Sequence, residues 1–172
     1  IRKKLQSIGA VLARPEFTQV RKTFNLPVGH EIIGGWIRVR DEGDKITLSL
    51  KVVDGSNIEN QKETQLKVDD FNNACSLLCM IGCGEKALQE TKRELWVLGN
   101  TEITIDEWPF LEPFVEIEGV SEQEVREVAD KLDFDWSKAK FCSIDTLYAE
   151  KYGITEDRVN YHTPRIAFDM TN

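Results

Sequence analysis

Apolar residues recur at helical spacing in four segments of the chain. At its start, Ile1, Leu5 and Ile8 lie three or four positions apart with cations between them, a pattern that predicts an amphipathic helix ended by Gly9. The other segments predict helices over residues 70–81, 121–132 and 144–152. Asp69 is placed to cap the first of these three, and Ser121 with Glu124 forms an S-x-x-E capping box at the start of the second.

Elsewhere the hydrophobic period changes to two, which predicts β-strands. The expected strands cover residues 17–26, 35–41, 45–53, 61–68, 88–98, 102–108 and 113–118. Short polar turns join several of them, at 42–44, at Asp54-Gly55 and at Gly99-Asn100. Because no strand–helix–strand alternation is present, the order favours an antiparallel meander that curls into a barrel, with hydrophobic helices outside it.

The strands alternate aliphatic with polar side chains, so each has two different faces. In the segment from Trp36, for example, Ile37 and Val39 point one way while Arg38 and Arg40 point the other. The aliphatic faces could form the core while the charged faces meet water, as in many antiparallel sheets. Alternatively, helices cover the aliphatic faces and the charged faces line a lumen, where charges must be paired, solvated or bound to a ligand. Alternation alone leaves both interpretations open.

Composition narrows the class of protein. The 172 residues are enough for one domain, and 41% hydrophobic residues are enough for a packed core. The net charge of −8 argues against a general nucleic-acid-binding surface. No apolar run approaches the ~20 residues of a membrane span, and the start does not resemble a signal peptide, so we expect a cytoplasmic protein without membrane or nucleic-acid partners. Because the chain begins without Met inside a helical pattern, we expect that upstream sequence is missing.

The cysteines fit the same compartment. Cys75, Cys79 and Cys83 follow one another at intervals of four on the helix expected over 70–81 and just after it, and Cys142 lies far away. The spacing differs from that of a zinc site, and His30 and His162 are the only histidines. We expect buried thiols and no disulfide.

An ordered set of short motifs resembles the CYTH superfamily, the triphosphate tunnel enzymes. These motifs are GWIRVR (35–40), TLSLK (47–51), KRE (92–94), IDE (105–107) and FVEIE (114–118). The resemblance covers roughly residues 1 to 152, with 153–172 expected as a polar tail of a single domain, 1–172. It implies an α+β fold, an antiparallel eight-stranded tunnel-like β-barrel with flanking helices. The family's E-x-E-x-K strand is absent, and we expect it upstream of Ile1.

The resemblance also implies roles for particular residues. The expected phosphate-binding cations are Arg21, Arg38, Arg40, Lys51 and Arg93. The expected ligands of Mg²⁺ or Mn²⁺ are Glu116 and Glu118, while Glu63 and Asp106 are expected to support catalysis or orient water. One departure is Gln65, which stands where the family usually has a second glutamate and which keeps the shape but loses the charge.

Two classes of function follow from the resemblance. The first is a metal-dependent enzyme that hydrolyses tripolyphosphate, ATP or thiamine triphosphate, or that cyclises ATP to cAMP and pyrophosphate. The second is a binding module that keeps the tunnel but has lost its chemistry, an alternative that Gln65 keeps open. Which triphosphate binds and whether the protein forms a homodimer are left undecided by the sequence.

Overall fold

The computed structural model describes residues 1–53 and 61–171. The expected turn at Asp54-Gly55 lies outside them. The chain divides into two compact units. Unit 1 contains Ile1–Phe17, Lys92–Trp108 and Glu112–Lys140, and unit 2 contains Thr18–Thr91, Pro109–Leu111 and Phe141–Asn172. The expectation of a single domain stays a prediction.

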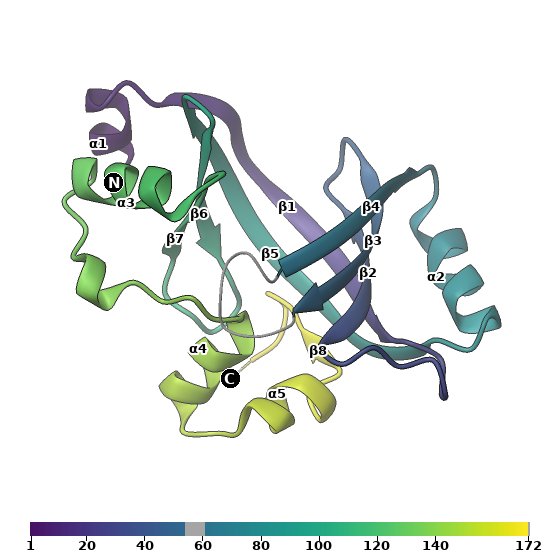
Figure 1. Ribbon diagram of the computed structural model, residues 1–172. Coiled ribbons are helices and arrows are strands. Elements are labelled where there is room, and N and C mark those ends of the chain that lie inside the picture. The colour runs from purple at the N-terminus through teal and green to yellow at the C-terminus, as the bar shows by residue number, and fades with distance from the viewer. Residues whose placement is uncertain (54–60, 172) are drawn as a thin grey trace. The chain divides into compact units, whose positions relative to one another are not determined.

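The described residues form eight strands and five α-helices (Figure 1). The strands are β1 (Val11–Asn25), β2 (Gly35–Asp41), β3 (Ile46–Val53), β4 (Gln61–Val68), β5 (Gly84–Leu98), β6 (Thr101–Glu107), β7 (Phe114–Glu118) and β8 (Arg165–Ile166). The helices are α1 (Arg2–Ser7), α2 (Phe71–Met80), α3 (Glu122–Lys131), α4 (Ile144–Tyr152) and α5 (Glu156–Tyr161).

The strand order is β4-β3-β2-β1-β5-β6-β7, with β8 beside β5. Neighbouring strands from β4 to β1 and from β5 to β7 pair antiparallel, whereas the two residues of β8 pair parallel to β5. The expected α+β fold with an antiparallel eight-stranded sheet and flanking helices is thus confirmed. Strands β4 and β7 lie at the two ends of this order and do not pair with each other among the described residues. The sheet is therefore open, and the closed barrel expected from the sequence is not observed.

Three local expectations differ from the structure. The cap of α2 is Asp70 and not Asp69, because the Asp70 carboxylate accepts the Asn73 N–H at 2.6 Å. Strand β1 begins at Val11, six residues before the expected start, in a stretch interrupted by Pro15. The expected polar tail contains α5 and β8, and it buries Val159 and Ile166. The cap of α3 is as expected, since Ser121 accepts the Glu124 N–H.

In both units the aliphatic side of the sheet packs against helices. The core of unit 1 joins α1, α3 and the sheet through Leu5, Ala10, Trp96, Ile103, Val128 and Leu132. The core of unit 2 joins α2 to the sheet through Phe24, Val39, Ala74, Cys75, Leu78 and Cys83. The alternating strands thus follow the second interpretation in one respect, since helices cover their aliphatic faces.

All four cysteines are free. Cys75 and Cys83 are buried as expected, whereas Cys79 and Cys142 are exposed. Burial raises the pKa of the Cys75 thiol to about 11, so this thiol stays protonated and unreactive at neutral pH. Among the described helices, none has the length and apolar character needed to cross a membrane.

The core of unit 1 predicts a contrast between two neighbouring residues of β6. Ile103→Ala removes a fully buried side chain and should lower the free energy of unfolding by about 2–5 kcal/mol. Glu102→Ala changes an exposed position on the opposite face and should stay within about 0.5 kcal/mol of the parent protein. Urea denaturation of both variants tests this. Equal losses would show that the assignment of the two faces is wrong.

Candidate functional site

The polar side of the sheet in unit 2 gathers cations from four neighbouring strands. They are Arg21 on β1, Arg38 and Arg40 on β2, Lys51 on β3 and Lys67 on β4. The register sets Arg21 opposite Arg40, and period-two alternation keeps Arg38 on the same side as Arg40. The Arg38 and Arg40 side chains are only 11% and 14% exposed. Arg38 and Arg40 are therefore largely buried, and they are not charges on a solvated surface.

Glu63 on β4 binds two of these cations at once. Its Oε1 accepts from Arg38 Nη2 at 3.2 Å, and its Oε2 lies 3.1 Å from Lys51 Nζ. Burial would raise the pKa of Glu63, but the Ser49 hydroxyl and the charges of Lys51 and Arg38 outweigh it and hold this pKa below its usual range. The carboxylate is therefore ionised at neutral pH and acts as a counterion for both cations.

Arg40 has its own buried counterion, Glu42. The Arg40 Nη2 atom lies 2.6 Å from Glu42 Oε1, and Lys45 Nζ lies 3.3 Å from Oε2 of the same residue. Two buried atoms nearby, Arg40 Nε and the hydroxyl of Thr47, have no hydrogen-bond partner among the described residues, and these two residues are opposite each other in the β2–β3 register. The Arg40 region therefore retains hydrogen-bonding capacity that an anion or water could use.

Arg21 is held in a different way. Its Nη2 donates to Gln19 Oε1 at 2.8 Å and to the Thr91 hydroxyl at 2.6 Å, and Thr91 also donates to Gln19. All three side chains are buried. The network fixes the guanidinium on the polar side of the sheet through neutral partners.

Unit 1 has an acidic counterpart built around one arginine. Arg93 on β5 donates from Nε and Nη2 to the two oxygens of Asp106 on β6, each at 2.6 Å, and Nη2 also donates to Glu116 on β7 at 2.7 Å. Thr104 adds a hydrogen bond to Asp106, which is fully buried. Bidentate pairing of this kind fixes the guanidinium plane.

The pKa of Glu116 is raised well above the ordinary value of a glutamate. Desolvation, the adjacent Asp106 and the more distant Glu118 all raise the pKa of Glu116, and the attraction of Arg93 only partly opposes them. Desolvation would lower the pKa of Arg93, but Asp106, Glu116 and Glu118 raise it above its ordinary value. Three carboxylates thus surround one guanidinium, and the excess negative charge is concentrated near Glu116.

The structure brings the predicted residues together as two groups. Arg21, Arg38, Arg40, Lys51 and Glu63 share the polar side of the sheet in unit 2, and Arg93, Asp106, Glu116 and Glu118 lie close to one another in unit 1. Within the described ranges, no three His, Cys, Asp or Glu side chains form a group that could hold a metal ion by themselves. Glu118, at the end of β7, is exposed.

Glu42 and Gln19 were not among the residues that the sequence predicted for the site. Glu42 was assigned to a turn, although the alternation that relates Arg38 to Arg40 extends to it two residues later. Gln19 precedes Arg21 by the same interval, so its place beside that residue was also visible in the sequence. Lys92 points away from Arg93, as alternation predicts, and pairs with Glu107 at 3.2 Å.

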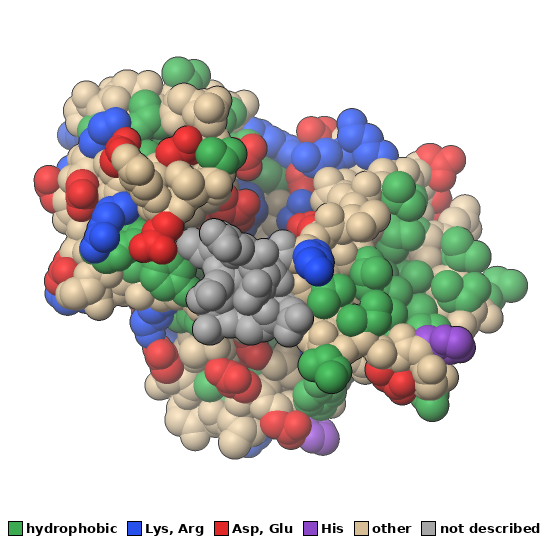
Figure 2. All heavy atoms as spheres, in the orientation of Figure 1, with side chains coloured by type: hydrophobic (Ala, Val, Ile, Leu, Met, Phe, Trp, Pro, Cys, Tyr) green, Lys and Arg blue, Asp and Glu red, His purple; other side chains and the backbone are tan. Residues whose placement is uncertain are grey.

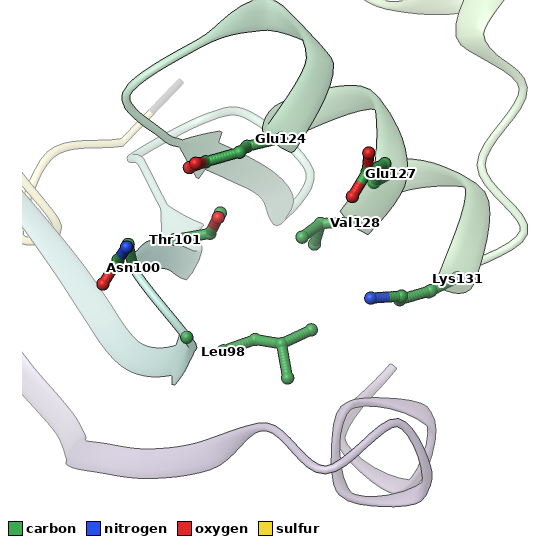
Figure 3. A pocket seen from close by; sticks show the side chains of 8 residues that line it. Leu98, Asn100, Thr101, Glu124, Glu127, Val128 and Lys131 are labelled. Atoms are coloured by element: carbon green, nitrogen blue, oxygen red, sulfur yellow. The ribbon is translucent and has the colours of Figure 1, made fainter.

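A pocket of about 280 Å³ lies elsewhere in unit 1, between α3 and the turn that joins β5 to β6 (Figure 3). Glu124, Glu127 and Lys131 of α3 point toward it, with Leu98 and Thr101 on the other side. None of the predicted site residues lines it. The pocket is therefore separate from both charged groups.

Comparison with protein-family models shows the family of this chain. The family model described as the CYTH domain matches residues 31–143, about two-thirds of the chain. This chain belongs to the CYTH domain family. The match includes the strands that carry most of the predicted cations and carboxylates of this CYTH protein, although it begins after Arg21.

Solved structures show the same fold. A conserved hypothetical protein from Pyrococcus furiosus has a TM-score of 0.69 and 20% identity, with 83% of this chain and 89% of that one covered. A candidate adenylate cyclase from Vibrio parahaemolyticus has a TM-score of 0.72 and 12% identity, with 86% and 89% covered. Another from Bacillus halodurans has a TM-score of 0.55 and 12% identity, with 88% and 89% covered. The comparison with curated proteins found no match for this CYTH chain.

The opposite pKa shifts of Glu63 and Glu116 predict opposite pH trends in stability. Glu63 has a lowered pKa, so it stabilises the fold above the ordinary carboxyl pKa, and this contribution disappears as the pH falls through the lowered value. Glu63→Gln should therefore reduce the free energy of unfolding at neutral pH, and this deficit should shrink on acidification. Urea denaturation at a series of pH values measures it.

Glu116 has a raised pKa, so its ionisation weakens the fold progressively as the pH rises from the ordinary carboxyl value to the raised one. Glu116→Gln should therefore gain stability relative to the parent protein over that rise in pH, whatever constant loss follows from the weakened contact with Arg93. Parallel trends for the two variants would contradict the assigned environments.

Proposed function

We propose that this CYTH protein is a metal-dependent enzyme that acts on triphosphates, either hydrolysing them or cyclising ATP. The observation that carries the proposal is the pair of largely buried guanidinium groups of Arg38 and Arg40, on one side of the sheet with Lys51. Burying such charges is unfavourable unless they are neutralised. Their counterions in the structure are carboxylates, which phosphate oxygens can replace.

The cations of unit 2 would bind the phosphates. Arg38 and Lys51 share Glu63, and Arg40 is bound to Glu42, so a polyphosphate that enters has to compete with these two carboxylates. Arginine suits this task because its planar fork binds two oxygens of a phosphate at once. The unused Nε of Arg40 and the hydroxyl of Thr47 supply two further donors for phosphate oxygens. Arg21 and Arg93 would add charge, each already fixed in orientation by its neighbours.

The carboxylates of unit 1 fit a hard divalent cation. Desolvation first, and then the nearby carboxylates of Asp106 and Glu118, raise the pKa of Glu116, and a bound cation would stabilise its ionised form. Mg²⁺ is usually held by one or two carboxylates with substrate phosphates and water, so it needs no cage of three protein ligands. Glu116 and Glu118 would hold Mg²⁺ or Mn²⁺, which would polarise a phosphoryl oxygen when bound.

Asp106 and Glu63 would act as orienting groups. Asp106 is fixed by Arg93 and Thr104, and Glu63 is fixed by Arg38 and Lys51. Attack by water would give hydrolysis, whereas attack by a ribose 3′-hydroxyl would release pyrophosphate and leave a cyclic nucleotide. In both reactions the cations would neutralise the negative charge that develops on the leaving phosphate.

A specific residue supports the second candidate, a binding module without catalysis. Gln65 lies on the polar side of β4 and its side-chain oxygen accepts from the Ser49 hydroxyl at 3.2 Å. A neutral amide there weakens the attraction for a metal relative to the glutamate usual in the family. Both candidates bind a triphosphate, and only the enzyme consumes it.

Arg40→Ala tests the binding step. Loss of a charge-assisted contact of about 1.5–3 kcal/mol should weaken tripolyphosphate binding by roughly 10- to 100-fold, as measured by titration calorimetry. Lys22→Ala is the matched control, because Lys22 is a cation on the neighbouring strand β1 that alternates with Arg21, so it points to the other side of the sheet, where it pairs with Glu85 at 3.0 Å. Equal affinity losses in both variants would indicate a general charge effect and not a site.

Glu118→Ala tests the metal step. Because Glu118 is exposed and belongs to the acidic group of unit 1, the variant should retain most tripolyphosphate affinity but lose at least about tenfold in metal-dependent turnover. ³¹P NMR with tripolyphosphate and ATP, in Mg²⁺ and then Mn²⁺, separates the reactions. Orthophosphate indicates hydrolysis, and pyrophosphate with a cyclic phosphodiester indicates cyclisation. Binding without any product would favour the module, and unchanged turnover in the variant would refute the metal assignment.

A further inference from the structure

An exposed apolar patch in unit 2 lies outside both charged groups. It combines one end of α2 with the loop that joins β1 to β2, and its large side chains are Val28, Ile32, Ile33, Leu77, Met80 and Ile81. Val28, Ile33 and Met80 are 92%, 93% and 85% exposed. Hydrophobic side chains gather in this part of the surface in Figure 2. We call these six residues the α2 patch.

The two halves of the α2 patch are adjacent. Gly82, which follows α2, lies so close to the loop that a side chain at this position would meet Pro27 at 3.6 Å. Pro27 directly precedes Val28, and Gly82 directly follows Ile81. The exposed residues of helix and loop therefore form one continuous surface.

The α2 patch is as large as the apolar part of a stable interface. A fully exposed large aliphatic side chain presents roughly 120 Å², so the six residues at their observed exposures present together on the order of 500 Å². A standard interface takes about 800 Å² from each partner. In homodimers about two-thirds of that area is apolar, which is close to what the patch offers.

Charge indicates which partner the patch suits. A contact between two copies related by a twofold axis brings a surface against itself, so any net charge on it is repelled by its own image. The chain has a net charge of −8, yet α2 contains no charged residue. The loop has one carboxylate, Glu31, which accepts the Gly29 N–H at 2.9 Å and is thereby bound to its own backbone.

We infer that the α2 patch is the contact surface of a homodimer. A second copy presents the same apolar surface, with one carboxylate in the loop and no charge on α2, so the contact meets the area requirement and brings few like charges together. The inference is independent of the proposed function, because none of the phosphate-binding or metal-binding candidates belongs to the patch.

The test compares the mass of the full chain and two variants in solution. Light scattering after size exclusion, from micromolar to submillimolar concentration, should give twice the 19.7 kDa of one chain. Met80→Glu places a charge in the contact and should raise the dimer dissociation constant more than about tenfold. The matched control is Val120→Glu, which alters a residue of unit 1 that is 79% exposed and lies outside the patch, and it should leave the dimer intact.

Cys79 provides a second readout, since it is exposed on α2 between Leu77 and Met80. In a Cys142→Ser background, its reaction with a maleimide should slow as the protein concentration rises, and Met80→Glu should abolish this protection. A monomer throughout the concentration range overturns the inference. So does a dimer that survives Met80→Glu or leaves Cys79 equally reactive.

Discussion

The fold removes several arginine side chains from water, and charges placed there must be neutralised. The polar side of the sheet depends on this constraint. Arg38, Arg40 and Arg93 lie on strands whose other side belongs to a hydrophobic core, so their position is dictated by packing. Charges held there are unfavourable without partners, and each of the three is bound by a carboxylate. The carboxylates therefore maintain the fold and, in the proposed function, occupy the place of a ligand's phosphates.

This dual use suggests how stability and binding are linked. A carboxylate that neutralises a cation strongly also competes strongly with an incoming anion. Glu63 divides its two oxygens between Arg38 and Lys51, while Glu42 is more deeply buried and serves Arg40 and Lys45. In the proposed function, these carboxylates would stabilise the folded protein without its ligand and would lower its affinity for that ligand, because they compete with it for the same cations.

Unit 2 has one charged surface and one apolar surface. One side of its sheet collects cations, whereas α2, which covers the other side, has no charge and exposes Leu77, Met80 and Ile81. Family membership and the fold agree with the proposed chemistry on the charged side. They say nothing about the α2 patch, for which area and charge alone support the dimer.

The sequence by itself determined the class of fold, nearly all strands and helices, and which residues of a strand point to the same face. These features follow from local periods of two and 3.6 and from turn residues, which need no distant partner. Alternation predicted that Arg38 and Arg40 lie together, and it also contained the unrecognised signal for Glu42. Local signals failed at β1, where Pro15 interrupts the pattern, and at α5 and β8, whose buried residues are few.

Only the tertiary structure decided which side of the sheet the helices cover and which carboxylate binds which cation. Both depend on strand order and register, which join residues far apart in the chain. The contacts of Arg93 with Asp106 and Glu116 are examples, since three strands must pair before they form. The raised pKa of Glu116 has the same origin, because strand pairing partly removes this carboxyl group from water and places it beside Asp106.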